Sequence, residues 1–193
     1  MRKPYRTLDD LPKQAPVFPL SGALLLPRGA LPLNVFEPRY LAMVDAALSQ
    51  VGCLGRITSF KESEDHRYQI TLTGVCRFRV AQELSADTPY RQVLCDYSTF
   101  AGDLVSGDDS ELPRERLMAA LKNYLARRDL KADWQSVMNA PPEHLVNALA
   151  MLCPFEPAEK QALLEAPGWN ERVATLVALL EMADARSVSG SFN

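Results

Sequence analysis

The sequence predicts an α+β protein in which a β-rich half precedes a helical half. Between Arg67 and Val80 apolar residues alternate with polar ones, which is the period of a half-buried strand. From Leu117 onward they recur at helical spacing instead. The stretch 102–111, rich in glycine and acidic residues, separates the two patterns and is predicted to be a linker. We therefore expect strands and helices to be segregated along the chain.

Five strands are predicted in the first half. The clearest, Arg67–Val80, has apolar residues at even positions except at Gly74, where we expect the strand to bend. Pro19 lies inside the first strand and places it at a sheet edge or a barrel seam. A polar hairpin turn is expected at residues 62–66. The predicted strands are Ala15–Leu20, Ala30–Phe36, Val51–Phe60, Arg67–Val80 and Tyr90–Phe100.

One helix is expected within the β-rich half and four after the linker. Pro38 suits a first helical position, and the apolar residues up to Leu48 follow at helical spacing, so this helix should plug or cap the sheet. In the second half, Pro142 and Pro157 each open a predicted helix, and Pro167-Gly168 ends the shorter one. The four later helices are marked by the apolar residues of 117–125, 145–152, 157–166 and 173–180.

Composition is that of an ordinary globular protein with room for a core. Of 193 residues, 47% are hydrophobic and 23% charged, and the net charge is −3, which opposes the broad basic face that nucleic acids require. The four cysteines form no C-x-x-C pair and are expected to be buried, reduced thiols. We see no signal peptide and no apolar run of about 20 residues, so we expect a cytoplasmic protein without a membrane span.

The order of motifs resembles the amino-terminal domain of Lon proteases. That family opens with a short F-P-L strand, a proline-glycine turn and a P-L-x-I-F-E-x-R-Y stretch that runs into a helix. The similar segments here are Val17–Leu20, Leu26-Pro27 and Leu31–Tyr40. Val51–Ile57 looks like the next strand of the family, and Gly74–Val80 like its G-x-x-R-F-x-V strand. The similarity spans about residues 15 to 100. Residues 159–165 resemble a K-Q-x-L-L-E stretch of the family's helical bundle.

This resemblance implies a PUA-like β-barrel at residues 12–101 and a small helical bundle at residues 111–186. In Lon proteases the region helps to recognise and feed unfolded substrates and supports assembly, and a similar domain in cereblon joins a ubiquitin-ligase adaptor. The ATPase and Ser-Lys protease domains that follow in Lon proteases are not part of this sequence. We therefore expect a stand-alone polypeptide-binding module, an adaptor in protein quality control. Its expected partners are unfolded or partly folded polypeptide, or a protease or chaperone.

Motifs for catalysis are missing from the sequence. Gly102 and Gly107 have the glycine spacing of a phosphate loop, but aspartates follow where a lysine and a hydroxyl residue are required. There is no G-x-S-x-G motif, and His66 and His144 belong to no zinc-binding pair. We expect no enzymatic activity, no cofactor and no metal. A Ser–Lys dyad assembled from distant residues remains an open alternative.

A structural lock is predicted where the second strand runs into its helix. Glu37 immediately precedes the helix, where its carboxylate can meet free backbone amides. We expect Arg39 or Arg77 to reach back to Glu37 or to exposed carbonyls and to fix the helix to the barrel. Tyr40, at the start of the helix, completes this predicted lock.

Two sets of residues are candidates for binding. Leu24, Leu25 and Leu26 cannot all face inward on one strand, so at least one is a candidate for exposed binding surface; burial by core and bundle together is the equally open alternative. Arg77 and Arg79 share the polar face of a predicted strand and could seat phosphates. RNA binding by a PUA-like protein is therefore the alternative function, although the overall acidity opposes a nucleic-acid partner.

Overall fold

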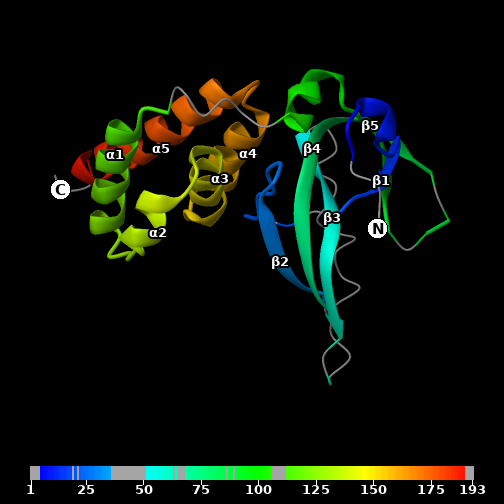
Figure 1. Cartoon of the computed structure of the whole chain (residues 1–193), viewed down its shortest axis with the longest axis horizontal. Coiled ribbons are helices and arrows are strands. Elements are labelled where there is room, and N and C mark those ends of the chain that lie inside the picture. Colours follow the sequence, from blue (N-terminus) through cyan, green and yellow to red (C-terminus); the bar gives the residue numbers. More distant parts are fainter. Residues whose placement is uncertain are drawn as a thin grey trace.

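The computed structural model describes residues 5–18, 20, 22–35, 51–62, 64, 68–85, 87–88, 90–105 and 112–189. These residues form a curled antiparallel sheet with a group of helices at one side of it (Figure 1). The predicted α+β class, strands first and helices second, is confirmed. The predicted helix after Pro38 and the predicted lock residues Glu37, Arg39 and Tyr40 lie outside the described residues, as does His66.

The sheet is built around β4 (Tyr68–Leu84), which at 17 residues is long enough to pair with three neighbours. β2 (Ala30–Val35) pairs with its first part and β5 (Gln92–Asp96) with its last part. β3 (Val51–Glu62) lies along the opposite side of β4, because Arg79 pairs with Val51 in β3 and also with Asp96 in β5. β1 (Gln14–Pro16) pairs with β5. Among the described strands no pair closes the sheet, so the barrel-like module is a curled, open one.

Gly74 marks the place where a loop crosses the sheet. A Cβ at this position would lie 2.0 Å from the carbonyl oxygen of Leu26, so only glycine fits beneath the loop. The Gly74 N–H donates to the Gly29 carbonyl at 2.9 Å, and the Arg28 N–H donates to the Gly74 carbonyl at 2.8 Å. The irregularity expected at Gly74 is therefore a close backbone approach, together with a register shift at Leu54 and Gly55 in the facing strand β3.

The alternation predicted for β4 is confirmed only in part, because the three consecutive residues Cys76, Arg77 and Phe78 are all buried. Cys76 and Phe78 are buried and Arg79 is exposed, as expected. Tyr68, predicted to be buried, is 41% exposed because the β3–β4 hairpin extends beyond the core. Arg77, predicted on the solvent side, is buried because η3 (Ser98–Leu104) packs over it.

The segment η3 corrects two predictions about the chain near residue 100. The fifth strand ends at Asp96, so the predicted extension to Phe100 is wrong. The linker expected from Gly102 does not begin there, because Asp103 is buried and paired with Arg77. Residues 106–111 lie outside the described part of the chain, and the division into residues 12–101 and 111–186 remains a prediction.

Of the five α-helices among the described residues, four coincide with predicted helices, and the last extends beyond the predicted residues 173–180. They are α1 (Arg114–Arg127), α3 (Pro142–Leu152), α4 (Pro157–Glu165) and α5 (Trp169–Ser189). The short α2 (Trp134–Asn139) was not predicted. It begins at Asp133, whose carboxylate accepts hydrogen bonds from the backbone N–H groups of Gln135 and Ser136. A 3₁₀ turn, η1 (Leu8–Asp10), precedes β1.

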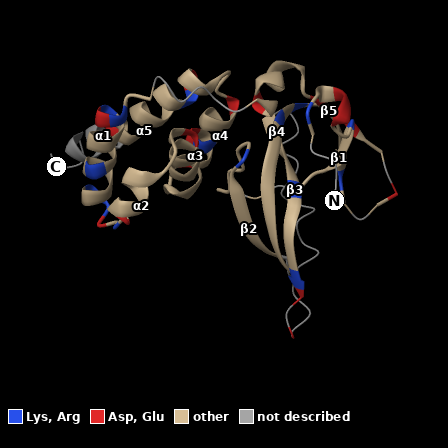
Figure 2. Cartoon of the chain, viewed as in Figure 1, with Lys and Arg blue, Asp and Glu red and all other residues tan. Residues whose placement is uncertain are grey.

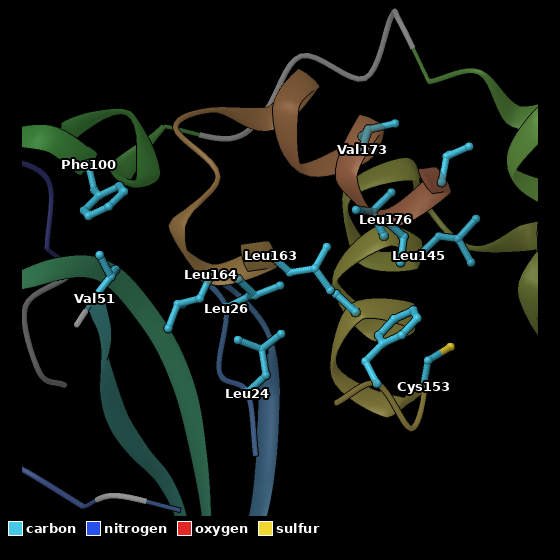
Figure 3. Close-up of a cluster of buried hydrophobic side chains, with 14 of the residues drawn as sticks. Leu24, Leu26, Val51, Phe100, Leu145, Cys153, Leu163, Leu164, Val173 and Leu176 are labelled. Atoms are coloured by element: carbon cyan, nitrogen blue, oxygen red, sulfur yellow. The ribbon is translucent and has the colours of Figure 1, made fainter. Parts of the chain in front are cut away.

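One apolar core joins the sheet to the helices. Leu24 and Leu26, from the loop before β2, lie beside Leu163 and Leu164 of α4 (Figure 3). The four cysteines are free, and three of them are buried as predicted, whereas Cys53 is half-buried. None of the described helices combines the length and the apolar composition that crossing a bilayer requires.

Candidate functional site

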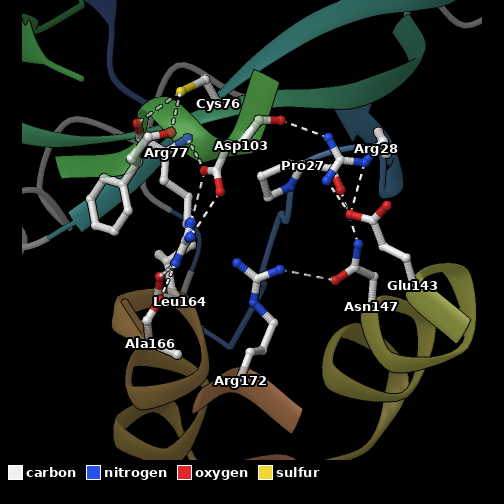
Figure 4. A network of polar contacts seen from close by, with 11 residues as sticks. Pro27, Arg28, Cys76, Arg77, Asp103, Glu143, Asn147, Leu164, Ala166 and Arg172 are labelled. Carbon is white, nitrogen blue, oxygen red and sulfur yellow. Dashed lines mark hydrogen bonds and ion pairs between the residues drawn. The ribbon is translucent and has the colours of Figure 1, made fainter. Parts of the chain in front are cut away.

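A buried ion pair connects the sheet to the helices. The Arg77 guanidinium, 2% exposed, donates to both carboxylate oxygens of Asp103 in η3, through Nε and Nη2 at 2.8 Å each (Figure 4). Its Nη1 donates to the carbonyls of Leu164, at 3.0 Å, and Ala166. One side chain of β4 therefore binds η3 and the end of α4 at once, and satisfies carbonyls that the helix leaves without a partner.

A second set of contacts fixes α3 to the loop that crosses Gly74. Arg28, which has a positive φ of 63°, donates through Nε to Glu143 of α3 at 2.8 Å and through Nη1 to the Asp103 carbonyl at 2.6 Å. The Asn147 amide donates to the Pro27 carbonyl at 3.0 Å. We call this contact region between sheet and helices the seam; its polar members are Arg28, Arg77, Asp103, Glu143 and Asn147. It is thus polar as well as apolar.

Arg172 of α5 adds a poorly compensated charge to this seam. It is 3% exposed, its Nη1 lies 3.4 Å from the Asn147 Oδ1, and its Nε has no hydrogen-bond partner. Burial, and next the charge of Arg77, lower the pKa of the Arg172 guanidinium to about 10, so it still carries its charge at neutral pH.

The structure buries some of the residues that were predicted to bind a ligand and leaves others exposed. Arg77 donates to the carbonyls at the end of α4, whereas the predicted lock concerned Glu37 and the helix after Pro38, which lie outside the described residues, and stays a prediction. Because Arg77 is buried, its predicted role as a phosphate contact is wrong. Arg79 is exposed and remains a predicted binding residue. Leu24 and Leu26 are 3% and 0% exposed, so their predicted part in an exposed binding surface is wrong: core and bundle cover them.

Leu25 is the half-buried member of that leucine run and points at the sheet. A Cβ on Gly55 would lie 3.0 Å from the Leu25 Cδ2 and 3.3 Å from the Leu72 Cβ. Leu25 therefore packs on the face of β3 and β4 that carries Leu72. That face is the strongest candidate for a binding surface.

The apolar face, as we call it, extends across β2, β4 and β3. Strand register places Leu31 of β2 and Ile57 of β3 on either side of Leu72, and Leu33 and Phe60 on either side of Ile70. Residues directly opposite each other in a sheet share a face, so these two rows form one surface. Its members are Leu31, Leu33, Ile57, Phe60, Tyr68, Ile70 and Leu72.

Much of the apolar face is accessible to solvent. Ile57, Phe60 and Tyr68 are 54%, 62% and 41% exposed, and the rings of Phe60 and Tyr68 lie 5.2 Å apart. The remaining members are half-buried. β2, and β4 up to Arg77, carry no charged residue and are tan in Figure 2, whereas the hairpin end of β3 carries Lys61 and Glu62.

A groove lies next to the sheet, between the start of β2 and α3. Its volume is about 560 Å³, and its lining includes Ala30, His144, Ala148, Met151 and Leu152. Leu152, at the rim, is 81% exposed although the sequence pattern assigned it to the apolar stripe of its helix. The groove mixes aliphatic and thioether surface with a few polar groups.

Within the described residues no cluster of histidine, cysteine and acidic side chains could hold a metal ion. Burial raises the pKa of the Cys76 thiol to about 12 and of the Cys153 thiol to about 11, so both are protonated at neutral pH. Neither has the thiolate character of a nucleophile.

Comparisons with known proteins give a consistent result. The family model of the ATP-dependent protease La (LON) substrate-binding domain matches residues 47–182. Lon protease 2 of Myxococcus xanthus is 26% identical over 204 aligned residues, which cover 89% of this chain and 24% of that protein. Lon protease of Desulfosudis oleivorans is 22% identical over 142 residues, 61% of this chain and 16% of that protein. The chain thus spans a quarter or less of the length of these relatives.

Solved structures show the same fold. A Lon N-terminal domain protein from Xanthomonas campestris superposes with a TM-score of 0.55 at 24% identity, covering 86% of this chain and 97% of that one. The N-terminal domain of Mycobacterium avium complex Lon protease gives a TM-score of 0.58 at 17% identity, covering 88% and 98%. The curled sheet followed by helices is therefore an arrangement that other proteins share.

Proposed function

Because the chain belongs to the family of the ATP-dependent protease La (LON) substrate-binding domain, we propose that it is a polypeptide-binding module that performs no catalysis itself. The observation that carries this proposal is the apolar face. Monomeric soluble proteins rarely expose a contiguous apolar surface of this kind unless it serves an interaction. Here it spans three strands and includes two aromatic rings.

The chemistry of the apolar face favours unfolded polypeptide as its ligand. Folded proteins bury most of their large apolar side chains, whereas unfolded chains present them to solvent. The face offers aliphatic and aromatic groups, and Glu62, opposite Tyr68, brings a carboxylate to its hairpin end. It is therefore matched to apolar side chains and poorly matched to the phosphates of RNA, which require several accessible cations.

In this proposal the module holds polypeptide and a separate protease or chaperone acts on it. The relatives named Lon protease are about four or more times longer than the matched region, so whatever cuts the substrate need not reside in residues 47–182. We propose that the chain serves as an adaptor in protein quality control.

The test is binding of fluorescein-labelled casein, an unfolded protein, measured by fluorescence anisotropy. The wild-type chain should bind, and Phe60→Asp should weaken binding about tenfold or more, because a buried phenylalanine contributes about 1.5–3 kcal/mol. Met138→Asp is the matched control: Met138 is 58% exposed but lies on α2, away from the apolar face. Failure of the wild-type chain to bind, or equal weakening by both variants, would refute the proposal.

A further inference from the structure

We propose that the bound polypeptide is held as an additional β-strand along the outer edge of β2. This inference rests on the proposed function and specifies how the ligand is gripped: by its main chain, in an extended conformation. β2 ends the hydrogen-bonded path of the sheet, with β4 on its inner side, and Figure 1 shows its other edge turned toward the helices.

The register determines which backbone groups of β2 point outward. In an antiparallel ladder, hydrogen-bonded pairs alternate with pairs that are not hydrogen-bonded to each other. Gly74 directs both its N–H and its C=O to the turn just before β2. Two and four residues before Gly74 in β4, the pairs Leu72–Leu31 and Ile70–Leu33 therefore carry the ladder hydrogen bonds. The backbone groups of the β2 residues that alternate with Leu31 and Leu33 must face away from β4.

Those outward residues are Ala30, Pro32 and Asn34. They present two N–H donors, from Ala30 and Asn34, and the three carbonyl acceptors. Among the hydrogen bonds of the described residues none ends on these outward groups, and all three side chains are exposed. An edge strand with free donors and acceptors is a template for pairing with another extended chain.

Hydrogen-bond complementarity selects the ligand. Donors and acceptors repeating along a strand match the main chain of any extended polypeptide, so recognition of this kind tolerates many sequences. Side chains of the added strand alternate between faces, and every second one lies next to the row of Leu31 and Leu33. The ligand that fits is therefore an extended segment with apolar residues at alternate positions.

The groove continues the outer edge of β2 at the end of the strand that begins with Ala30. Ala30 belongs both to the outward set and to the groove lining, together with Met151 and Leu152 of α3. A volume of about 560 Å³ has room for a side chain of the added strand at the level of Ala30. The edge and the groove thus form one continuous path.

Pro32 limits a competing use of the edge. It has no N–H, so pairing with β2 of a second copy of this chain would lack a donor on both strands, a common protection against edge-to-edge association. When a polypeptide ligand pairs with β2, a donor is missing only on β2, at Pro32.

The experiment compares two substitutions at a single position. Asn34→Pro removes an outward N–H without touching the β2–β4 ladder, and Asn34→Ala changes the side chain and keeps the N–H. Binding of labelled casein should weaken about fivefold for Asn34→Pro relative to Asn34→Ala, because one hydrogen bond is lost. Adding Ala30→Pro should extend the loss to roughly twentyfold. Pro32→Ala supplies a donor and should tighten binding.

A second readout does not depend on the folding of proline variants. Saturating the wild-type chain with casein should slow hydrogen exchange of the Ala30 and Asn34 amides. If casein binds and Phe60→Asp weakens it, but Asn34→Pro equals Asn34→Ala and neither amide is protected, the edge is not the site while the proposed function stands. If the wild-type chain does not bind casein, the proposed function itself fails. Dimerisation that Asn34→Pro abolishes, with casein binding unchanged, would assign the edge to a second copy and overturn the inference.

Discussion

Replacing Arg77 by methionine tests whether the buried ion pair holds sheet and helices together. The substitution removes four side-chain hydrogen bonds, two to the Asp103 carboxylate and two to the carbonyls of Leu164 and Ala166. The carboxylate of Asp103, a residue that is 7% exposed, keeps only the hydrogen bond from the Arg77 backbone N–H, at 2.9 Å. A buried charge without its partner costs about 3–5 kcal/mol. For a chain of 193 residues this corresponds to a drop in Tm of about 6–20 °C.

The assay is thermal unfolding followed by circular dichroism, with urea unfolding as a second measure. Arg77→Met combined with Asp103→Leu should recover most of the lost stability, because an apolar pair of similar volume can replace a buried ion pair at little cost. A Tm of Arg77→Met within about 2 °C of wild type would refute the reasoning.

Arg172→Met is the matched control for this experiment. Arg172 is buried like Arg77, but its Nε has no partner and its one hydrogen bond, to Asn147, is 3.4 Å long. Removing this guanidinium abolishes a desolvation cost and a repulsion from Arg77. The Tm of Arg172→Met should therefore equal or exceed that of wild type. An equally large drop in both variants would show that burial of the side chain, and not its pairing, sets the cost.

Three further predictions concern Gly74, Asp133 and the buried cysteines Cys76 and Cys153. Gly74→Ala should lower the Tm by several degrees in thermal unfolding, because its Cβ would lie 2.0 Å from the Leu26 carbonyl oxygen; an unchanged Tm would contradict the close approach. Hydrogen bonds from the Ser136 side chain and backbone hold the pKa of Asp133 below its ordinary value of 3.8, so the cap of α2 is present above that value and is lost as the pH falls through the lowered pKa. NMR of the Ser136 amide should show this transition in wild type and not in Asp133→Ala. Burial raises the pKa of the Cys76 and Cys153 thiols, so at pH 8 the native chain should label equally with a disulfide reagent whether or not both are changed to serine.

The local elements follow from the sequence because each depends on a short-range pattern. Period-two alternation located β4, an apolar run located β3, and prolines at first helical positions located α3 and α4. α2 was missed because it is only six residues long and shows no apolar stripe; Asp133, as its cap, was the available signal.

The seam could not be predicted, because its contacts join distant parts of the chain. Asp103 lies in a stretch whose glycine and acidic residues suggest a linker, and nothing local distinguishes it from its neighbours. Its burial results from Arg77, 26 residues earlier. Arg77 in turn stands at an odd position of an alternating strand, where solvent is the ordinary neighbour, and only the packing of η3 makes that side an interior.

The apolar face was only partly visible in the sequence. Alternation assigned Ile70 and Leu72 to an apolar face of the sheet, but it predicted that this face is buried along its whole length. Exposure of Phe60 and Tyr68 depends on how far the β3–β4 hairpin extends past the core, which no local pattern encodes. Of the leucine run, Leu24 and Leu26 fill the core and only Leu25 packs on the face.

The most direct test of the account offers one protein to the chain in two states. Native α-lactalbumin and its reduced, carboxymethylated form have the same sequence, but only the second exposes its apolar segments. Titration of the labelled proteins should give saturable binding of the unfolded form alone. Equal affinity for both forms, or none for either, would contradict the claim that the apolar face binds unfolded polypeptide.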